Sequence, residues 1–112
     1  MASPILDNVV RLAPGASKEL HFTNHTRGPV DMQDPVTFVV RPVETLTFVV
    51  DEEDGRPVNK VYYVTSDRHA QDFGPFLAER KYRDYNWLIT AFGEGLLRRW
   101  TTVRVPRAPG GS

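Results

Sequence analysis

Apolar and polar residues alternate in several short stretches of the chain, which is the pattern of half-buried β-strands. The alternation is clear across residues 17–23, and residues 36–51 are rich in β-branched and aromatic side chains. Arg41-Pro42 interrupts the second stretch; because proline cannot donate to a central ladder, we predict two strand segments or one bulged strand there. Residues 24–35, with one glycine and two prolines, are predicted to form a loop. Residues 9–12 are predicted to pair only briefly.

In the middle of the chain, a tight turn is followed by a change from strand to helical periodicity. Asp54-Gly55 supplies the positive φ angles of a hairpin turn, so we expect residues 58–65 to return as a strand. Ser66 or Asp67 can then cap a helix, because apolar residues recur at helical spacing as far as residue 77. Gly74-Pro75 is predicted to break or restart this helix.

The last part of the chain returns to β periodicity. Residues 86–92 are predicted to form a strand, residues 93–95 a glycine turn and residues 96–105 the last strand. Several strands, one helix and a final hairpin form the order of an OB-fold, a five-stranded and partly open Greek-key barrel. We therefore expect an all-β, OB-fold-like barrel with one inserted helix; a small β-sandwich with a peripheral helix is the alternative. A single domain over residues 1–107 is predicted, followed by a flexible tail, residues 108–112.

Composition is typical of a soluble globular protein, and we expect from the N-terminal residues that it is not exported. At 112 residues the chain can bury one core, and its 40% hydrophobic and 25% charged residues are ordinary for a globular domain. The absence of cysteine excludes disulfides, zinc ribbons and a thiol nucleophile. No apolar run approaches the roughly 18 residues of a spanning helix, and the N-terminus lacks the basic and apolar regions of a signal peptide. We expect a cytoplasmic protein without a membrane partner.

Charge is unevenly distributed although the formal net charge is zero. Residues 1–78 carry 7 Lys and Arg against 11 Asp and Glu, whereas residues 79–112 carry 7 against 3. A local basic region matters more for binding a polyanion than the total charge does. The acidic run at residues 51–54 would repel phosphate, so we predict a solvated turn there, outside any nucleic-acid path. A solvated surface of mixed sign is the alternative interpretation of the basic region.

The last predicted strand carries the strongest candidate for a binding surface. Alternation places Arg98, Trp100 and Arg104 on one face and Arg99 on the other. Guanidinium groups can pair with phosphates while an indole stacks on a base, a combination that non-specific single-strand binders use. In the alternative, Trp100 packs inward or against the helix and the arginines are solvated.

Other aromatic and basic residues could extend this surface. Tyr62 and Tyr63 are adjacent and must face opposite ways on their strand. Because Lys60 shares the face of Tyr62, we expect Tyr62 at the surface and Tyr63 in the core. For Trp87, the pattern is compatible with either a core or a surface position. The predicted nucleic-acid-binding residues are Trp100, Arg98, Arg104, Tyr62, Lys60, Arg41, Phe38 and Trp87.

A resemblance to a known family covers about residues 55–106. The segment KVYYVTSDRHAQDFGPFLAERKYRDYNWLITAFGEGLLRRWTTVRV resembles the C-terminal half of small OB-fold single-stranded-DNA-binding proteins, particularly those encoded by phages. In that pattern a strand ends in Thr-Ser and leads into a helix, and the next strand closes on Gly-Glu-Gly before a basic, aromatic last strand. The resemblance implies a DNA-replication role, in the host cytoplasm if the protein is phage-encoded. Ala91-Phe92 stand where the pattern often has an arginine, which leaves one phosphate contact unsupported.

The sequence does not indicate an enzyme. His21, His25 and His69 lack the spacing of a two-histidine metal motif on a helix, and no nucleophile elbow, P-loop or dinucleotide fingerprint occurs. No metal or cofactor is expected. We expect binding of single-stranded DNA, or of RNA, with little sequence preference. A β-rich virion structural or protein-interaction module is the alternative, and a homo-oligomer is left open.

Overall fold

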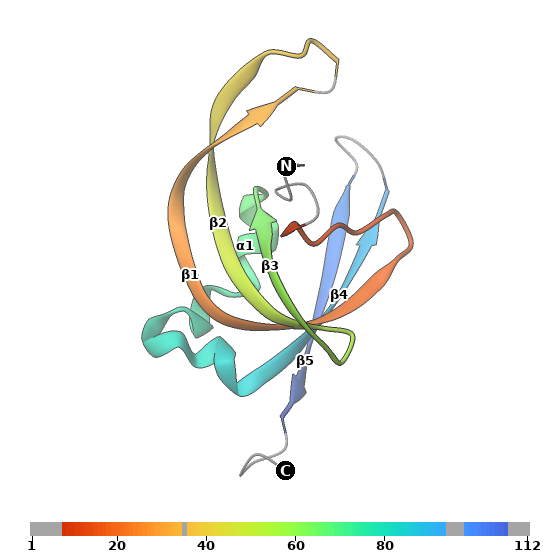
Figure 1. Cartoon of the computed structure of the whole chain (residues 1–112), viewed down its shortest axis with the longest axis vertical. Helices are drawn as coiled ribbons and strands as arrows, with labels where there is room; N and C mark the ends of the chain where they lie inside the picture. The colour runs from red at the N-terminus through yellow and green to blue at the C-terminus, as the bar shows by residue number, and fades with distance from the viewer. Residues whose placement is uncertain (1–7, 35, 94–97, 108–112) are drawn as a thin grey trace, which may run out of the picture.

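The computed structural model describes residues 8–34, 36–93 and 98–107, and these form one curled antiparallel sheet with a short helical region inserted (Figure 1). The strand order is β3-β2-β1-β4-β5. The predicted all-β barrel-like fold with one inserted helix is confirmed. In chain order the elements are β1 (Ser17–Gln33), β2 (Val40–Glu53), β3 (Arg56–Val64), α1 (Asp67–Gln71), η2 (Gly74–Phe76), η3 (Ala78–Asp84), β4 (Tyr85–Phe92) and β5 (Arg99–Pro106).

The segment before β1 contacts β3 on one side and the residue that precedes β5 on the other. Val9 forms a parallel bridge to Val61 of β3, and the Val10 N–H donates to the Val61 carbonyl at 2.8 Å. On the other side, the Arg98 guanidinium donates to the Leu12 carbonyl. The short pairing predicted for residues 9–12 is therefore confirmed for Val9 and Val10, and the segment links β3 to the residue that precedes β5.

The core is largely aromatic and centres on Phe22. Its ring stacks on Phe48 with centroids 4.2 Å apart, and Phe73 meets it edge-on at 5.7 Å. Phe73 follows the C-cap residue of α1, so the inserted helical region closes the inner face of the sheet. A few large side chains can fill a small barrel, and truncating one such phenylalanine to alanine typically costs about 3–5 kcal/mol. The largest fully buried side chains are Trp87, Tyr82, Phe22, Phe48, Phe73, Leu20, Leu46, Ile89, Val50 and Thr45.

β1 and β2 extend beyond the barrel as a two-stranded arm, residues 24–34 and 36–45 (Figure 1). The predicted loop at residues 24–35 is therefore wrong: β1 continues to Gln33, with Pro29 opposite Glu44. Edge positions tolerate proline, and within the described residues β1 pairs with β4 only as far as His21. Pro42 likewise lies inside β2, and the register shifts occur at residues 21–24 and 50–52 rather than at Arg41-Pro42.

The predicted turns and caps are present where the structure describes them. Asp54 and Gly55 have φ angles of 53° and 82°, which confirms the hairpin turn. The Ser66 hydroxyl caps α1 by accepting from the His69 N–H, and α1 ends before Gly74-Pro75, which open a 3-10 turn. Most of the predicted turn at residues 93–95, and the tail at 108–112, lie outside the described residues. In the described ranges, no helix has the length and apolarity needed to cross a membrane.

Candidate nucleic-acid interface

Trp100 lies at the start of β5 and packs against α1. Its indole stacks on the imidazole of His69, with centroids 5.0 Å apart and an interplanar angle of 8°. The guanidinium carbon of Arg98 lies 5.5 Å from the centroid of the indole. The side chain is half-buried against the core. Of the two positions considered from the sequence, the structure has the one in which Trp100 packs against the helix.

His69 is held by a chain of hydrogen bonds that runs from the core to β5. Its Nδ1 lies 3.3 Å from the Asp72 carboxylate and its Nε2 lies 2.8 Å from the Tyr62 hydroxyl. Burial lowers the pKa of His69 despite the opposing effect of Asp72. The neutral ring therefore donates from Nδ1 to the carboxylate and accepts the Tyr62 O–H at Nε2. Thr102 of β5 donates to Asp72 at 2.8 Å, which ties the chain to the strand beside Trp100.

Two cavities of about 600 and 590 Å³ adjoin Trp100, and three residues line both of them. We call these two cavities together the groove. The shared residues are Ser66, Arg98 and Trp100. The first cavity is also lined by Val9, Val10, Arg11, Leu12, Tyr62, Tyr63 and Thr65. The second is also lined by Arg68, His69, Asp72 and Arg99.

The lining of the groove is strongly basic. Four arginines contribute to it, and Asp72 supplies the one carboxylate among the described lining residues. That carboxylate is already engaged by Thr102 and His69. The Nε of Arg98 is buried and has no hydrogen-bond partner in the described part of the chain. The four arginines are Arg11, Arg68, Arg98 and Arg99.

Tyr62 and Trp87, both predicted for the binding surface, belong to the core. Tyr62 is 5% exposed and lies opposite Phe48, whereas Tyr63 is half-buried and lines the groove. The expected faces of the two tyrosines are therefore reversed, because Lys60, which shares the face of Tyr62, turns to Glu53 rather than to open solvent. Trp87 is 1% exposed, and its indole N–H donates to the Tyr82 carbonyl at 3.1 Å.

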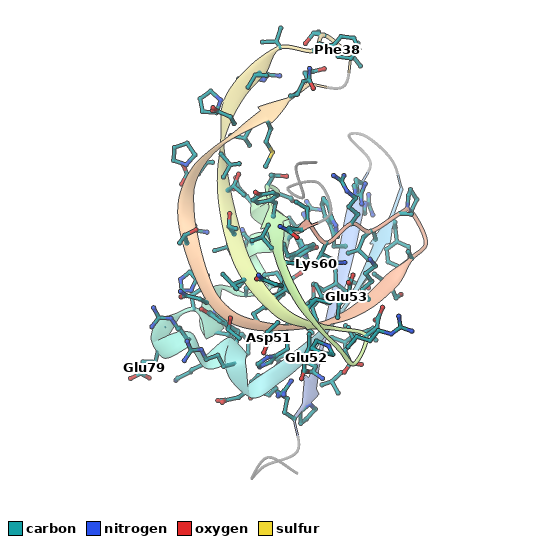
Figure 2. The ribbon with its side chains drawn as sticks, in the orientation of Figure 1. Phe38, Asp51, Glu52, Glu53, Lys60 and Glu79 are labelled. Atoms are coloured by element: carbon teal, nitrogen blue, oxygen red, sulfur yellow. The ribbon has the colours of Figure 1, made fainter. Side chains whose placement is uncertain are left out.

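The remaining predicted residues do not gather around Trp100. The Lys60 ammonium lies 2.7 Å from Glu53. Arg104, expected beside Trp100, instead covers the rings of Phe76 and Tyr85 at 4.6 and 5.2 Å, near the other end of β5. Arg41 lies 3.5 Å from Asp34 in the arm, and Phe38 lies at the tip of the arm, far from Lys60 (Figure 2). Of the predicted set, Arg98 and Trp100 line both cavities of the groove, and the buried Tyr62 lines the first.

The acidic side chains of residues 51–53 contact basic side chains, whereas Asp54 is exposed in the hairpin turn. Asp51 lies 2.7 Å from His21, and Glu52 lies 3.0 Å from Arg107. Glu53 accepts from both Lys18 and Lys60 at 2.7 Å (Figure 2). Burial works to raise the pKa of Glu53, but the hydrogen bonds and charges of the two lysines hold that pKa below its ordinary value. The run lies at the β2-β3 turn, away from the groove at the other end of β3.

Arg11 and Arg68 are groove residues that the sequence patterns did not single out, and Tyr63, predicted for the core, also lines the groove. Arg11 belongs to the segment before β1, and Arg68 follows the capping residue of α1. Neither shares a periodic face with Trp100, so only the fold brings them together. Arg99, predicted for the opposite face of its strand, also contributes to the lining.

In the described ranges no group of three or more His, Asp or Glu side chains could hold a metal ion. Comparison of the chain with protein-family models, curated proteins and solved structures finds no match.

Proposed function

We propose that the protein binds single-stranded DNA in the groove, with little sequence preference. The observation that carries the proposal is the convergence of four arginines and one already engaged carboxylate on two adjoining cavities. Guanidinium groups pair with phosphates in a planar, bidentate geometry. Contacts of this kind follow the backbone of a nucleic acid and carry no direct base information.

The groove offers only a small aromatic surface on which bases could stack. One face of Trp100 is covered by His69, so the indole is less open to stacking than an exposed tryptophan would be. Tyr63 is the other half-buried aromatic side chain of the lining. Stacking on Tyr63 would add to phosphate contacts from the arginines, and we expect the arginines to supply most of the affinity.

The unpaired Nε of Arg98 also fits an anionic ligand. A buried donor without an acceptor costs free energy. Within the described residues, Arg98 donates to the Leu12 carbonyl while its Nε has no partner. A phosphate oxygen bound beside Trp100 would supply the missing acceptor after a small movement of the side chain.

The place of the groove in the fold gives further support by analogy. OB-folds bind oligonucleotides on the face of strands 2 and 3 and on the loops between strands 1 and 2 and between strands 4 and 5. Here the arm joins β1 to β2, and it lies at the same end of the molecule as the start of β5 (Figure 1). The likeness is one of fold, and the chemistry of the lining carries the functional argument.

A titration of fluorescently labelled oligo-dT, followed by anisotropy at about 50 mM salt, tests the proposal. We expect saturable binding with a Kd in the micromolar range, and similar affinity for oligo-dA. An unchanged anisotropy up to about 100 µM protein would overturn the proposal. A parallel titration with oligo-U compares DNA with RNA.

A second function, a virion structural or protein-interaction module, is favoured by the arm. Four large apolar side chains at its tip are more than half exposed: Val36, Phe38, Val39 and Val40. Exposed apolar patches of this kind mark interaction sites in soluble proteins. The tip and the groove share no residue, so the two functions are compatible.

A further inference from the structure

The two cavities of the groove differ in the chemistry of their linings. The first is lined mainly by apolar and aromatic side chains, and Arg11 is the arginine that belongs to it alone. The described lining of the second contains no aliphatic side chain, and Arg68 and Arg99 belong to it alone. Arg98 and Trp100 lie on the boundary, because each of them lines both cavities. The apolar and aromatic residues of the first cavity are Val9, Val10, Leu12, Tyr62 and Tyr63.

The second cavity brings together three arginines, Arg68, Arg98 and Arg99. In the part of the chain that the structure describes, none of the three forms an ion pair with a carboxylate. Arg68 and Arg99 are exposed, whereas Arg98 is half-buried and is oriented by its hydrogen bond to the Leu12 carbonyl. A guanidinium that is already oriented loses less conformational freedom when it binds a phosphate.

The charge of the second cavity suits a dianion. Among its described lining residues, three arginines are opposed by one carboxylate, that of Asp72, which leaves a net charge of +2. His69 adds no charge, because burial lowers its pKa and keeps the ring neutral. The other acidic residue nearby on α1, Asp67, lines a different cavity. A phosphodiester within a strand carries one negative charge, whereas a phosphate monoester carries about −1.5 to −2 at pH 7.

The first cavity is suited to a base rather than to a second phosphate. Its volume of about 600 Å³ lies in the range of cavities that hold small organic ligands, roughly 300–1,000 Å³. Tyr63 is half-buried in its lining and can stack on a base of any type. A nucleotide that lies across Arg98 and Trp100 therefore has its base in one cavity and its phosphate in the other.

We propose that the groove preferentially binds the phosphorylated end of a DNA strand. The base of the terminal nucleotide stacks on Tyr63 in the first cavity, and its phosphate monoester binds the three arginines of the second. Arg11 then contacts the phosphodiester that follows. The inference rests on the proposed function and adds which part of a strand binds most tightly. Internal stretches still bind, because a phosphodiester pairs with the same arginines through a single charge.

A competition experiment with three unlabelled oligo-dT strands, each about six nucleotides long, tests the preference. One strand has a 5′-phosphate, one has a 3′-phosphate and one has hydroxyl groups at both ends. Each displaces a single fluorescently labelled oligo-dT at pH 7.5, so no dye occupies the end that is compared. We expect one of the phosphorylated strands to bind at least about 10-fold more tightly than the unphosphorylated strand. The phosphate that gives this gain defines the direction of the strand in the groove.

The other outcomes separate this inference from the proposed function. Equal affinities for all three strands would overturn the end preference and leave single-strand binding in the groove intact. Equal gains from the 5′- and 3′-phosphates would indicate general attraction to charge, and would also overturn the preference. If none of the three strands, nor a longer oligo-dT, displaces the labelled strand, both the inference and the proposed function fail.

Single variants assign the preference to the second cavity. Arg68→Gln and Arg99→Gln each remove one arginine of that cavity, and each should reduce the preference by roughly 3-fold or more. Arg11→Gln is the matched control: it should weaken phosphorylated and unphosphorylated strands alike and leave their ratio unchanged. All three positions are exposed, so each variant should fold, as circular dichroism checks. A ratio that falls equally in all three variants, or in none of them, would contradict the proposed position of the phosphate.

Discussion

The indole of Trp100 and the imidazole of His69 lie face to face, 5.0 Å apart between ring centroids and 8° from parallel. This stack joins the start of β5 to α1, and the hydrogen bond from Tyr62 to His69 continues the connection into the core. Trp100, which lines both cavities of the groove, therefore packs on a buried, neutral histidine. The stability of the fold and the shape of the groove depend on the same contacts.

Stability should fall as the solution becomes acidic. Burial holds the pKa of His69 below its ordinary value of 6.5, so the unfolded chain takes up a proton at a higher pH than the folded chain does. The stabilisation is complete above pH 6.5 and is lost as the pH falls toward the lower, folded pKa. Thermal unfolding from pH 8 to pH 5 should show a melting temperature that declines below pH 6.5.

His69→Gln is the variant that tests this assignment. It should lower stability at pH 8, because the hydrogen bonds and the ring stack are lost, and it should flatten the decline below pH 6.5. Burial also lowers the pKa of His25, so His25→Gln is the matched control and should remove a separate part of the slope. A His69→Gln variant with the full wild-type pH dependence would show that His69 contributes none of it.

Tyr62→Phe should destabilise the protein. The change removes the hydroxyl that lies 2.8 Å from His69 Nε2 and leaves a buried acceptor unpaired. The expected loss is about 1–3 kcal/mol in urea unfolding. Tyr63→Phe, on the opposite side of the same strand, should change the free energy of unfolding by less than about 0.5 kcal/mol. Equal effects of the two substitutions would contradict the core position of Tyr62.

Tyr63 rather than Tyr62 should contribute to DNA binding. Removing one base-stacking side chain costs about 1–3 kcal/mol, so Tyr63→Ala should raise the Kd for oligo-dT by roughly 5- to 150-fold. Tyr63→Phe keeps the ring and should bind like the wild type. If Tyr63→Ala binds with wild-type affinity by anisotropy, the stacking platform lies elsewhere.

Periodicity predicted most of the strands because alternation and turn chemistry are local. Asp54-Gly55 is recognisable alone, and so is the Ser66 cap before α1. The arm was missed because glycine and two prolines in residues 24–35 normally indicate a loop. In the arm, β1 and β2 each have one edge with no neighbouring strand. Glycine and proline are tolerated at such edges. That tolerance depends on which strands pair in the folded sheet, and a local sequence pattern does not show this pairing.

The groove was only partly predictable for a related reason. Alternation grouped Arg98 with Trp100, and the two side chains do lie together, but alternation could not reveal that His69 would stack on the indole. Arg11 and Arg68 come from the segment before β1 and from α1, so their approach to β5 depends on the closed tertiary structure. The tyrosine faces were reversed because Lys60, on the same face as Tyr62, pairs with Glu53 across the β2-β3 hairpin, and alternation alone does not show such a pair.

The most direct test of the groove as a DNA site compares two double variants that remove equal charge. Arg11→Gln/Arg68→Gln removes two of the four groove arginines, whereas Arg56→Gln/Lys81→Gln removes two exposed cations that do not line the groove. The measurement is the slope of log K for oligo-dT against log salt concentration. For three to four phosphate contacts, the wild-type slope should be about −2 to −3, which is a roughly 20- to 50-fold loss of affinity between 50 and 200 mM salt.

The groove variant should have a slope smaller in magnitude by about 1.4, with clearly weaker binding at 50 mM salt. The control variant should stay close to the wild type in both slope and affinity. If the two variants weaken binding equally, the affinity follows overall charge rather than the groove, and the proposed site is contradicted.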